Sequence, residues 1–238
     1  MPRRGMHVTP SPVDLGDLRR LQPIDARFGG GRGKPIDRHY IEGFLARHAA
    51  DVRGHVLEVA DDHYTRRYGG AAVQASDILH ADASNPGATL VGDLGSGRGL
   101  PRGRFDCFIC TQTLQYVFAL PDAIGHIHDL LKPGGVLLLT VPGISQISPY
   151  DRDRWGEHWR FTPQSVRRLL QAAFGADEVE VRGHGNVLAA IGFLHGLACE
   201  DLSVEELDHP DDRYPVLVTA RARRSDPGAP RGVRKVSE

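Results

Sequence analysis

Hydrophobic residues along this chain follow two patterns, which predict different secondary structures. Short, nearly continuous apolar runs bounded by turn residues are typical of buried strands, whereas apolar residues spaced three and four apart are typical of helices. The apolar runs predict strands over residues 55–60, 72–78, 88–94, 105–111, 136–141, 178–181 and 215–222. The helical spacing predicts helices over residues 36–50, 121–131, 163–173 and 186–199.

Strands that alternate with helices predict an α/β fold. Because the strands are apolar throughout, we expect most of them to be parallel and covered by helices on both faces. The closing helix, long loop and strand predict a late antiparallel strand. The expected fold is a Rossmann-like, seven-stranded, mostly parallel sheet over residues 31–222, between a flexible N-terminal segment (1–30) and a flexible tail (223–238). A ligand should bind outside the carboxyl ends of its strands.

The charge balance changes the expected partner. The chain has 238 residues, with 29 Lys and Arg against 30 Asp and Glu, and a net charge of −1. This removes the positive field expected of a protein that binds nucleic acid or an anionic membrane. No apolar stretch is long enough to span a membrane, and the first residues lack a signal-peptide core. We therefore expect a cytoplasmic monomer or homodimer that binds a small molecule.

The cysteines and histidines predict no metal or redox centre. Cys107 and Cys110 lie three apart on a predicted strand, so their side chains should point to opposite faces of the sheet. We expect reduced thiols rather than a disulfide or a zinc site. His126 and His128 are two apart on a predicted helix and face different directions, so no metal is expected there either.

Four segments at predicted strand ends carry acids or glycines in a recognisable order. They are VLEVA (56–60), SDIL (76–79), GDL (92–94) and LLKPGGVLLLTVPG (130–143). In these segments the chain resembles the class I S-adenosylmethionine-dependent methyltransferases, of the methyltransferase type 11-like kind, over about residues 36–222. The resemblance implies that the cofactor is S-adenosyl-L-methionine.

The resemblance also implies where that cofactor lies. It puts Glu58 beside the methionine part, Asp77 against both ribose hydroxyls and Asp93 near the adenine. Asp77 follows Glu58 by 19 residues, close to the roughly 20 that precede the ribose-binding acid of nucleotide-binding folds. Alternatively, Glu58 is satisfied by nearby backbone N–H groups and Asp77 caps a turn. The other expected cofactor residues are Tyr64, Ile78, Leu94, Thr111, Gln112, Arg32 and Tyr40.

The loop after the first strand departs from the family. Residues 60–70 (ADDHYTRRYGG) lack the GxGxG pattern that lets the backbone approach the cofactor. Either this charged loop is simply solvated, or the hydroxyl of Tyr64 or Thr65 and the guanidinium of Arg66 hold the amino-acid end of the cofactor instead. A lid over the same end is expected from Arg32, Arg38 and Tyr40.

A second glycine-rich segment is interpreted as a loop. Residues 92–99 (GDLGSGRG) match the glycine pattern better than the first strand does. If they followed the first strand, however, three good strands before them would have no place. We expect residues 95–103 to form a flexible loop before the fourth strand.

Two segments are candidates for the substrate site. Residues 111–116 (TQTLQY) follow the fourth strand, where the family faces cofactor and substrate, so Gln115 is a candidate substrate residue. A helix N-cap by Thr111 or Thr113 is the alternative. The loop over residues 145–161 concentrates aromatic and charged side chains, and its WRFTP run resembles methyltransferases of sugar and surface-polysaccharide pathways. Its expected substrate residues are Tyr150, Trp155 and Arg160.

His158 in the same loop is the candidate catalytic residue. Methyl transfer to a hydroxyl needs a base for the proton, and an imidazole can serve near neutral pH. The alternative is that His158 is a structural hydrogen-bonding residue between Trp155 and Trp159.

The resemblance therefore implies a methyltransferase that acts on a small-molecule hydroxyl, such as that of a sugar or glycosylated metabolite. The alternative is a methyltransferase-fold protein that no longer methylates and instead catalyses another reaction or acts as a binding scaffold, because a fold does not fix a function. A nicotinamide oxidoreductase is disfavoured, since the first loop lacks GxGxxG.

Overall fold

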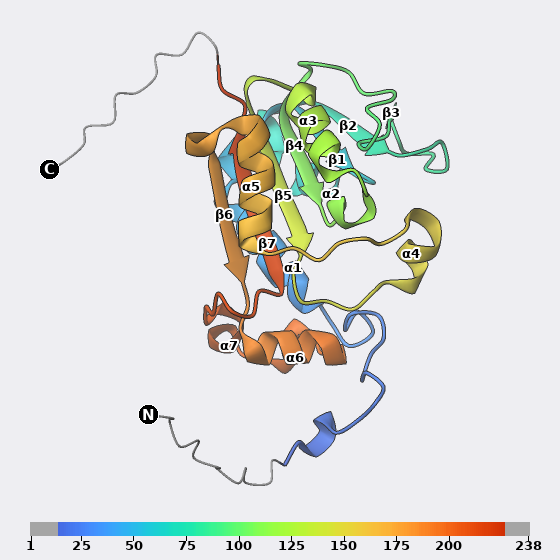
Figure 1. The fold of residues 1–238 in the computed structure, drawn as a ribbon, viewed down its shortest axis with the longest axis vertical. Coiled ribbons are helices and arrows are strands. Elements are labelled where there is room, and N and C mark those ends of the chain that lie inside the picture. The colour runs from blue at the N-terminus through green and yellow to red at the C-terminus, as the bar shows by residue number, and fades with distance from the viewer. Residues whose placement is uncertain (1–13, 227–238) are drawn as a thin grey trace, which may run out of the picture.

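A seven-stranded sheet organises residues 14–226, the part of the chain that this computed structural model describes (Figure 1). The strand order is β3-β2-β1-β4-β5-β7-β6. Strands β1 to β5 are parallel to one another, whereas β7 runs antiparallel between β5 and β6. The predicted fold class is confirmed. The strands are β1 (Gly54–Val59), β2 (Val73–His80), β3 (Leu90–Val91), β4 (Phe105–Thr111), β5 (Leu131–Pro142), β6 (Val179–His184) and β7 (Leu217–Arg223).

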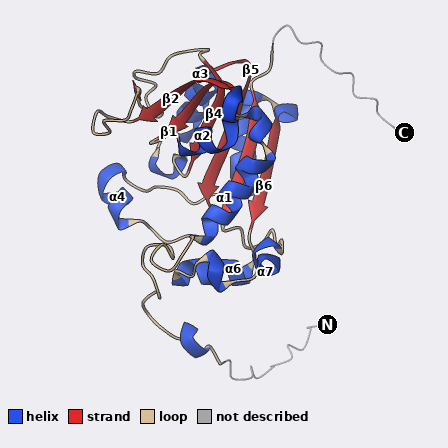
Figure 2. Cartoon of the chain, turned by 180° about the vertical axis from the view of Figure 1, so that it is seen from behind, coloured by secondary structure: helices blue, strands red, loops and turns tan. Residues whose placement is uncertain are grey.

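Helices cover both faces of the sheet and its carboxyl edge (Figure 2). α1 (Ile36–Arg47) and α2 (His63–Gly69) lie on one face, and α3 (Leu120–Leu130) and α5 (Pro163–Phe174) lie on the other. Three further helices lie beyond the carboxyl ends of the strands: α4 (Pro149–Trp155), α6 (Val187–His195) and α7 (Val204–Asp208).

The sheet separates two hydrophobic cores because successive strand residues point to opposite faces. On β4, Cys107 and Ile109 join the core under α1, whereas Phe108 and Cys110 join the core under α3 and α5. The expectation that the two cysteines face opposite sides is confirmed, and both are buried free thiols.

Several element boundaries differ from those expected. α1 ends at Arg47, before a short 3-10 turn, and β2 extends two residues further than expected, to His80. α6 ends at His195 because Gly196 adopts a left-handed conformation with φ of 72°.

Three helices were not expected from the sequence. The segment after β1, interpreted as a charged loop, forms α2. α4 begins after Ser148, whose hydroxyl accepts the backbone N–H of Asp151, and α7 begins after Ser203, which forms a capping box with Glu206. Short polar helices of this kind lack the apolar periodicity that reveals longer ones.

The N-terminal boundary also differs. Residues 24–30, expected to lie outside the domain, contact α6: the backbone N–H of Ile24 donates to the carbonyl of His195 at 2.8 Å, and the rings of Phe28 and Phe193 lie 5.8 Å apart. Residues 1–13 and 227–238 lie outside the described part. Among the helices of residues 14–226, none is long and apolar enough to cross a membrane.

Candidate functional site

The carboxyl ends of β1 and β4 form the centre of the candidate site. β1 pairs with β2 on one side and with β4 on the other. The chain continues from β1 toward β2 but from β4 toward β5, so the strand order reverses between β1 and β4, and ligands bind at this position in such sheets. Ala60 and Gln112 follow the two strands with φ of 72° and 46°, the left-handed region that normally favours glycine. Ala60 stands where the family loop has its first glycine. The backbone turn is therefore kept although the glycine is absent.

Three side chains beside this point have oxygens that lack a partner. Asp37 Oδ1, Gln112 Oε1 and Gln115 Oε1 are buried and make no hydrogen bond with any described residue. The three side chains are connected, since Gln112 Nε2 lies 3.5 Å from Asp37 Oδ2 and Gln115 Nε2 donates to the Gln112 carbonyl at 2.9 Å. Because buried acceptors are normally satisfied, this cluster is suited to a ligand that carries N–H or O–H donors.

An arginine that is hydrogen-bonded to a tyrosine lies next to the cluster. Arg38, half-buried on α1, donates from Nη1 to the Tyr64 hydroxyl of α2 at 3.0 Å. Burial raises the pKa of Asp37, while the neighbouring charge of Arg38 lowers it. The site therefore holds a guanidinium for an anionic group beside acceptors for a cationic one. Arg38, Tyr64, Asp37, Gln112 and Gln115 are together called the cradle here. The helix that carries Tyr64 was not expected.

Glu58 is buried and fully occupied by α2. Its carboxylate accepts the backbone N–H of Tyr64 at 3.1 Å and both the N–H and the hydroxyl of Thr65 at 2.7 Å. Burial raises the pKa of Glu58 to about 7, and the hydrogen bonds from Thr65 and Tyr64 oppose that rise. The acid caps the helix that replaces the glycine-rich loop, as in the structural alternative considered for it.

Asp77 is a correction to the sequence analysis. It lies three residues before the end of β2, and its carboxylate bonds to His55 Nε2 at 2.8 Å, Thr89 Oγ1 at 2.6 Å and Arg104 Nη2 at 2.7 Å. Those three residues lie at the amino ends of neighbouring strands, opposite to the candidate site. Both carboxylate oxygens are therefore directed away from the place where a ribose was expected.

The turn after β3 is held by its own acid. Asp93 accepts the N–H of Gly95 at 2.8 Å and the hydroxyl of Ser96 at 2.7 Å. Leu94 is buried in the core, and its carbonyl bonds to His126 Nδ1. The glycine-rich segment precedes β4, as expected, but it forms a hydrogen-bonded turn. Ile78, the remaining expected residue of β2, exchanges backbone and side-chain hydrogen bonds with Thr89.

Arg32 and Tyr40 are further corrections, because neither side chain reaches the cradle. Arg32 makes a bidentate pair with Asp201 at 2.9 and 2.6 Å. The Tyr40 hydroxyl donates to the Leu207 carbonyl at 2.8 Å, and its ring stacks on His184. Both residues tie α1 and the segment before it to the region around α7, so the expected lid is a structural contact.

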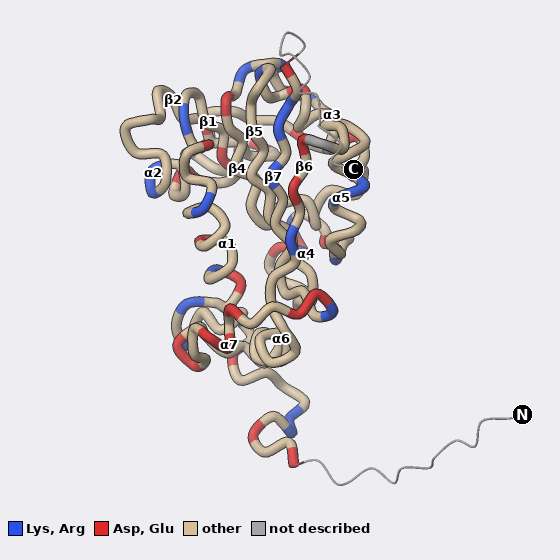
Figure 3. The backbone as a smooth tube through the Cα atoms, turned by 90° about the vertical axis from the view of Figure 1, so that its left-hand side faces the viewer, with Lys and Arg blue, Asp and Glu red and all other residues tan. Residues whose placement is uncertain are grey.

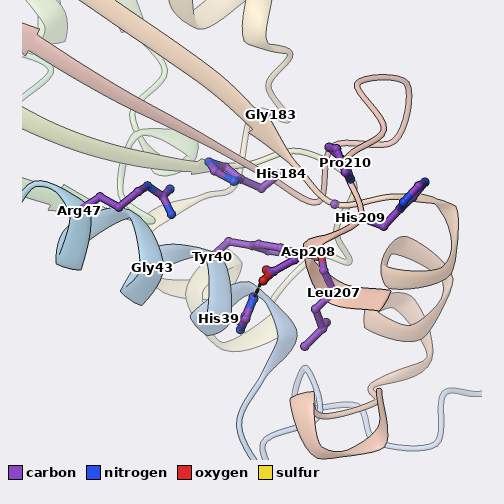
Figure 4. Close-up of a pocket in the computed structure, with 11 residues that line it drawn as sticks. His39, Tyr40, Gly43, Arg47, Gly183, His184, Leu207, Asp208, His209 and Pro210 are labelled. Atoms are coloured by element: carbon purple, nitrogen blue, oxygen red, sulfur yellow. Dashed lines mark hydrogen bonds and ion pairs between the residues drawn. The ribbon is translucent and has the colours of Figure 1, made fainter. Parts of the chain in front are cut away.

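Tyr40 lines a separate cavity of about 220 Å³ between α1, the end of β6 and α7 (Figure 4). The His39–Asp208 pair, 2.7 Å apart, lies at its centre, and Arg47 lies at one end. Burial lowers the pKa of His184 in its wall to about 4. Asp37 and Arg38 belong to the cradle whereas His39 and Tyr40 line this cavity, so α1 separates the two.

The segment between β5 and α5 crosses the carboxyl edge. Trp155 packs edge-on against His80 at the end of β2, with ring centroids 5.4 Å apart, so α4 reaches from β5 to β2. The guanidinium of Arg160 pairs with the buried carboxylate of Glu157 at 2.7 Å and donates hydrogen bonds to loop carbonyls. Tyr150 is exposed, and the guanidinium of Arg154 lies over one face of its ring. Of the expected substrate residues, Arg160 therefore shapes the loop and Trp155 closes it against β2.

His158 lies at the rim, next to Gln115. Its backbone N–H donates to the Gln115 carbonyl at 2.8 Å, and its exposed ring lies edge-on to Phe118, with centroids 5.4 Å apart. Phe118 is 71% exposed and stacks on Trp159. The ring of Phe118 is therefore largely open to solvent at the rim. The expected position of His158 between two tryptophans is not observed: it contacts Phe118.

The sequence analysis missed Asp37, the residue that distinguishes this site. An acid in the first turn of a helix is common because it interacts favourably with the helix dipole, so the residue type gave no signal. Asp82 was not considered in the sequence analysis either. It lies just after β2, 3.2 Å from His80, with a side chain 53% exposed. Across residues 14–226 no group of three His, Cys, Asp or Glu is arranged to hold a metal ion.

Comparisons with known proteins bear on the family and the fold. A sequence model of the methyltransferase-domain family matches residues 28–182. The structure is similar to that of a methyltransferase dependent on S-adenosylmethionine from Mesorhizobium loti, with a TM-score of 0.52 and 17% identity over 79% of this chain and 98% of that one. A methyltransferase of the same dependence from Archaeoglobus fulgidus gives 0.52 and 11% over 78% and 94%.

A third similar structure belongs to a different reaction class. The [4+2]-cyclase SpnF gives a TM-score of 0.52 and 17% identity, covering 82% of this chain and 85% of that one. At these identities the structures share the fold alone. A comparison with curated proteins gave no match.

Proposed function

The chain belongs to the class I S-adenosylmethionine-dependent methyltransferase family, and on that basis we propose that it transfers a methyl group from S-adenosyl-L-methionine to a hydroxyl of a small molecule, such as a sugar or glycosylated metabolite. The observation that carries this proposal is the cluster of buried acceptor oxygens on Asp37, Gln112 and Gln115, beside the Arg38 guanidinium.

These groups complement the amino-acid end of the cofactor. Its ammonium needs acceptors, which Asp37 and Gln112 supply, and its carboxylate needs a cation, which Arg38 supplies together with the Tyr64 hydroxyl. For the ribose hydroxyls we propose Asp82 in place of Asp77. Its exposed carboxylate lies beyond the carboxyl end of β2, and the contacts with Ser84 N–H at 2.8 Å and His80 at 3.2 Å both involve Oδ1. When bound, S-adenosylmethionine supplies an electrophilic methyl group on a sulfonium.

The residues at the rim are suited to the acceptor. Phe118 and Trp159 offer an apolar face on which a sugar ring can lie, and Gln115 Oε1 can accept a hydrogen bond from a substrate hydroxyl. His158 contacts Phe118 through its ring and Gln115 through its backbone N–H. It is proposed to take the hydroxyl proton, because an imidazole can accept a proton near neutral pH. The chain thus contributes alignment and a base, the two requirements of transfer to oxygen.

Calorimetry with S-adenosylmethionine tests the proposal directly. We expect binding by the whole protein, and no binding at millimolar ligand would refute it. A matched control is Asp122→Asn, another acid in the first turn of a helix, which is exposed on α3 and should leave binding unchanged. Asp37→Asn should weaken binding.

The alternative is a methyltransferase-fold protein that no longer methylates. The observation in its favour is that Glu58 and α2 occupy the segment where the family has its glycine-rich loop. Cofactor binding without methyl transfer to any of a panel of hydroxylated acceptors, read from the absence of S-adenosylhomocysteine, would support this alternative.

A further inference from the structure

Helix α6 is apolar around its whole circumference. Ala189, Ala190, Gly192 and Phe193 are buried against the domain. The opposite face, called here the α6 stripe, is exposed and consists of Val187 (48%), Leu188 (40%), Ile191 (39%) and Leu194 (41%). At 3.6 residues per turn these four side chains form one continuous band about 10 Å long. A helix that is apolar on all sides is normally buried on all sides, so a covering partner is expected for the stripe.

The segment before residue 24 has the complementary character. Residues 14–22, called here the arm, extend away from the body of the protein (Figure 1). Leucines recur every three residues in the arm, at 15, 18 and 21, and Leu21 is fully exposed while Leu15 is 45% exposed. The arm is anchored where Ile24 bonds to the His195 carbonyl at the end of α6. It therefore starts beside the stripe of its own copy but does not cover it.

Charge determines which partner suits the stripe. Acidic residues are concentrated around α7, next to α6 (Figure 3), and three of them pair with Arg32, His39 and Arg213 of the same chain. They are Glu200, Asp201, Glu205, Glu206, Asp208, Asp211 and Asp212. An anionic membrane would be repelled by this acidic region, because helices that lie on such membranes carry Lys and Arg beside their apolar face. The arm carries Arg19 and Arg20 beside its leucines, which matches both the apolar stripe and the acidic region.

We propose that the α6 stripe binds the arm of a second copy of this chain. The exchange is reciprocal, so each copy gives one arm and receives one, and the two contacts are related by a twofold axis that closes the assembly as a dimer. The leucines of the arm cover the α6 stripe, and its arginines face the acidic region around α7. This interface is independent of the methyl-transfer chemistry proposed above.

The mass of the protein in solution tests the proposal. Sedimentation equilibrium at concentrations up to about 100 μM should give twice the 26.0 kDa of the chain. Ile191→Glu on the stripe and Leu21→Glu on the arm should each raise the dissociation constant about a hundredfold or more, because each buries an unpaired charge in an apolar contact. Val91→Glu is the matched control, since Val91 is 47% exposed on β3, away from α6, and this variant should remain a dimer.

Mixing experiments distinguish arm exchange from other contacts. A disulfide between a copy carrying Leu21→Cys and a copy carrying Leu188→Cys is expected, and its absence overturns the exchange. A monomer at every concentration overturns the dimer, and dissociation by Ile191→Glu but not by Leu21→Glu overturns the role of the arm. Flotation with vesicles that contain phosphatidylserine should show no binding, and binding that Ile191→Glu abolishes would assign the stripe to a membrane. Circular dichroism of each variant confirms that the fold is kept.

Discussion

The two halves of the carboxyl edge of the sheet differ in whether the oxygens of their polar side chains have hydrogen-bond partners. At β1 and β3, Glu58 and Asp93 have both carboxylate oxygens occupied by nearby amides and hydroxyls. At β4 and the start of α1, Asp37, Gln112 and Gln115 each leave a buried oxygen without a partner among the described residues. An unsatisfied buried acceptor costs about 1–3 kcal/mol, which a ligand that binds only the folded state can offset. Among Glu58, Asp93 and Asp37, the two halves of the edge therefore differ in the state of the hydrogen bonds and not in the residue type.

Replacing Glu58 by Ala gives the strongest test of the satisfied half. The change leaves two buried amides and one hydroxyl at the start of α2 without an acceptor, so we expect a loss of about 3 kcal/mol in the free energy of unfolding. Urea denaturation measures it. Glu180→Ala, exposed on β6, is the control and should change stability by less than about 0.5 kcal/mol.

Asp77→Ala should also act on stability rather than on binding. It leaves His55, Thr89 and Arg104 without their shared partner, at a cost of about 2 kcal/mol, reduced because Arg104 is partly exposed and its charge is screened by solvent. Thermal unfolding and cofactor calorimetry on the same variant separate the two roles. A tenfold loss of cofactor affinity without loss of stability would restore Asp77 as the ribose ligand, whereas Asp82→Ala is expected to weaken binding.

Asp37→Asn tests the unsatisfied half, with the opposite outcome. Stability should not fall, because burial disfavours the charge that the change removes. Affinity for S-adenosylmethionine should fall about tenfold, corresponding to about 1.4 kcal/mol. A loss of stability with normal affinity would mean that the two halves of the edge do not differ in function.

The pH dependence of cofactor binding gives the smallest but most specific effect. Burial raises the pKa of Asp37, so its carboxyl takes up a proton at a higher pH than an exposed aspartate does. Only the ionised form attracts an ammonium, and binding should therefore weaken as the pH falls through that raised pKa. Calorimetry at a series of pH values from neutral downwards checks this. In Asp37→Asn the same dependence should be absent.

Local patterns predicted the framework of the site well. β4 has the expected bounds, and the alternation of its residues placed Cys107 and Cys110 on opposite faces, because strand geometry alone fixes that result. The helix after residue 162 also begins where Pro163 indicated, at a position where proline loses no hydrogen bond. The motif order identified the fold and the family, whereas the roles of Gln112, Gln115 and Tyr64 stay predictions.

The sequence by itself determined the order of the strands, the helices with clear apolar periodicity, and the family. Tertiary structure decided the role of each acid. Asp77 is 22 residues from His55 and 27 from Arg104, and only the parallel pairing of their strands brings these groups together. Asp37 is 75 residues from Gln112, and the packing of α1 leaves both with an oxygen that nothing in residues 14–226 satisfies. A carboxylate has the same chemistry in every sequence, and the partners that folding brings within hydrogen-bond distance decide whether it caps a helix, ties strands together or awaits a ligand.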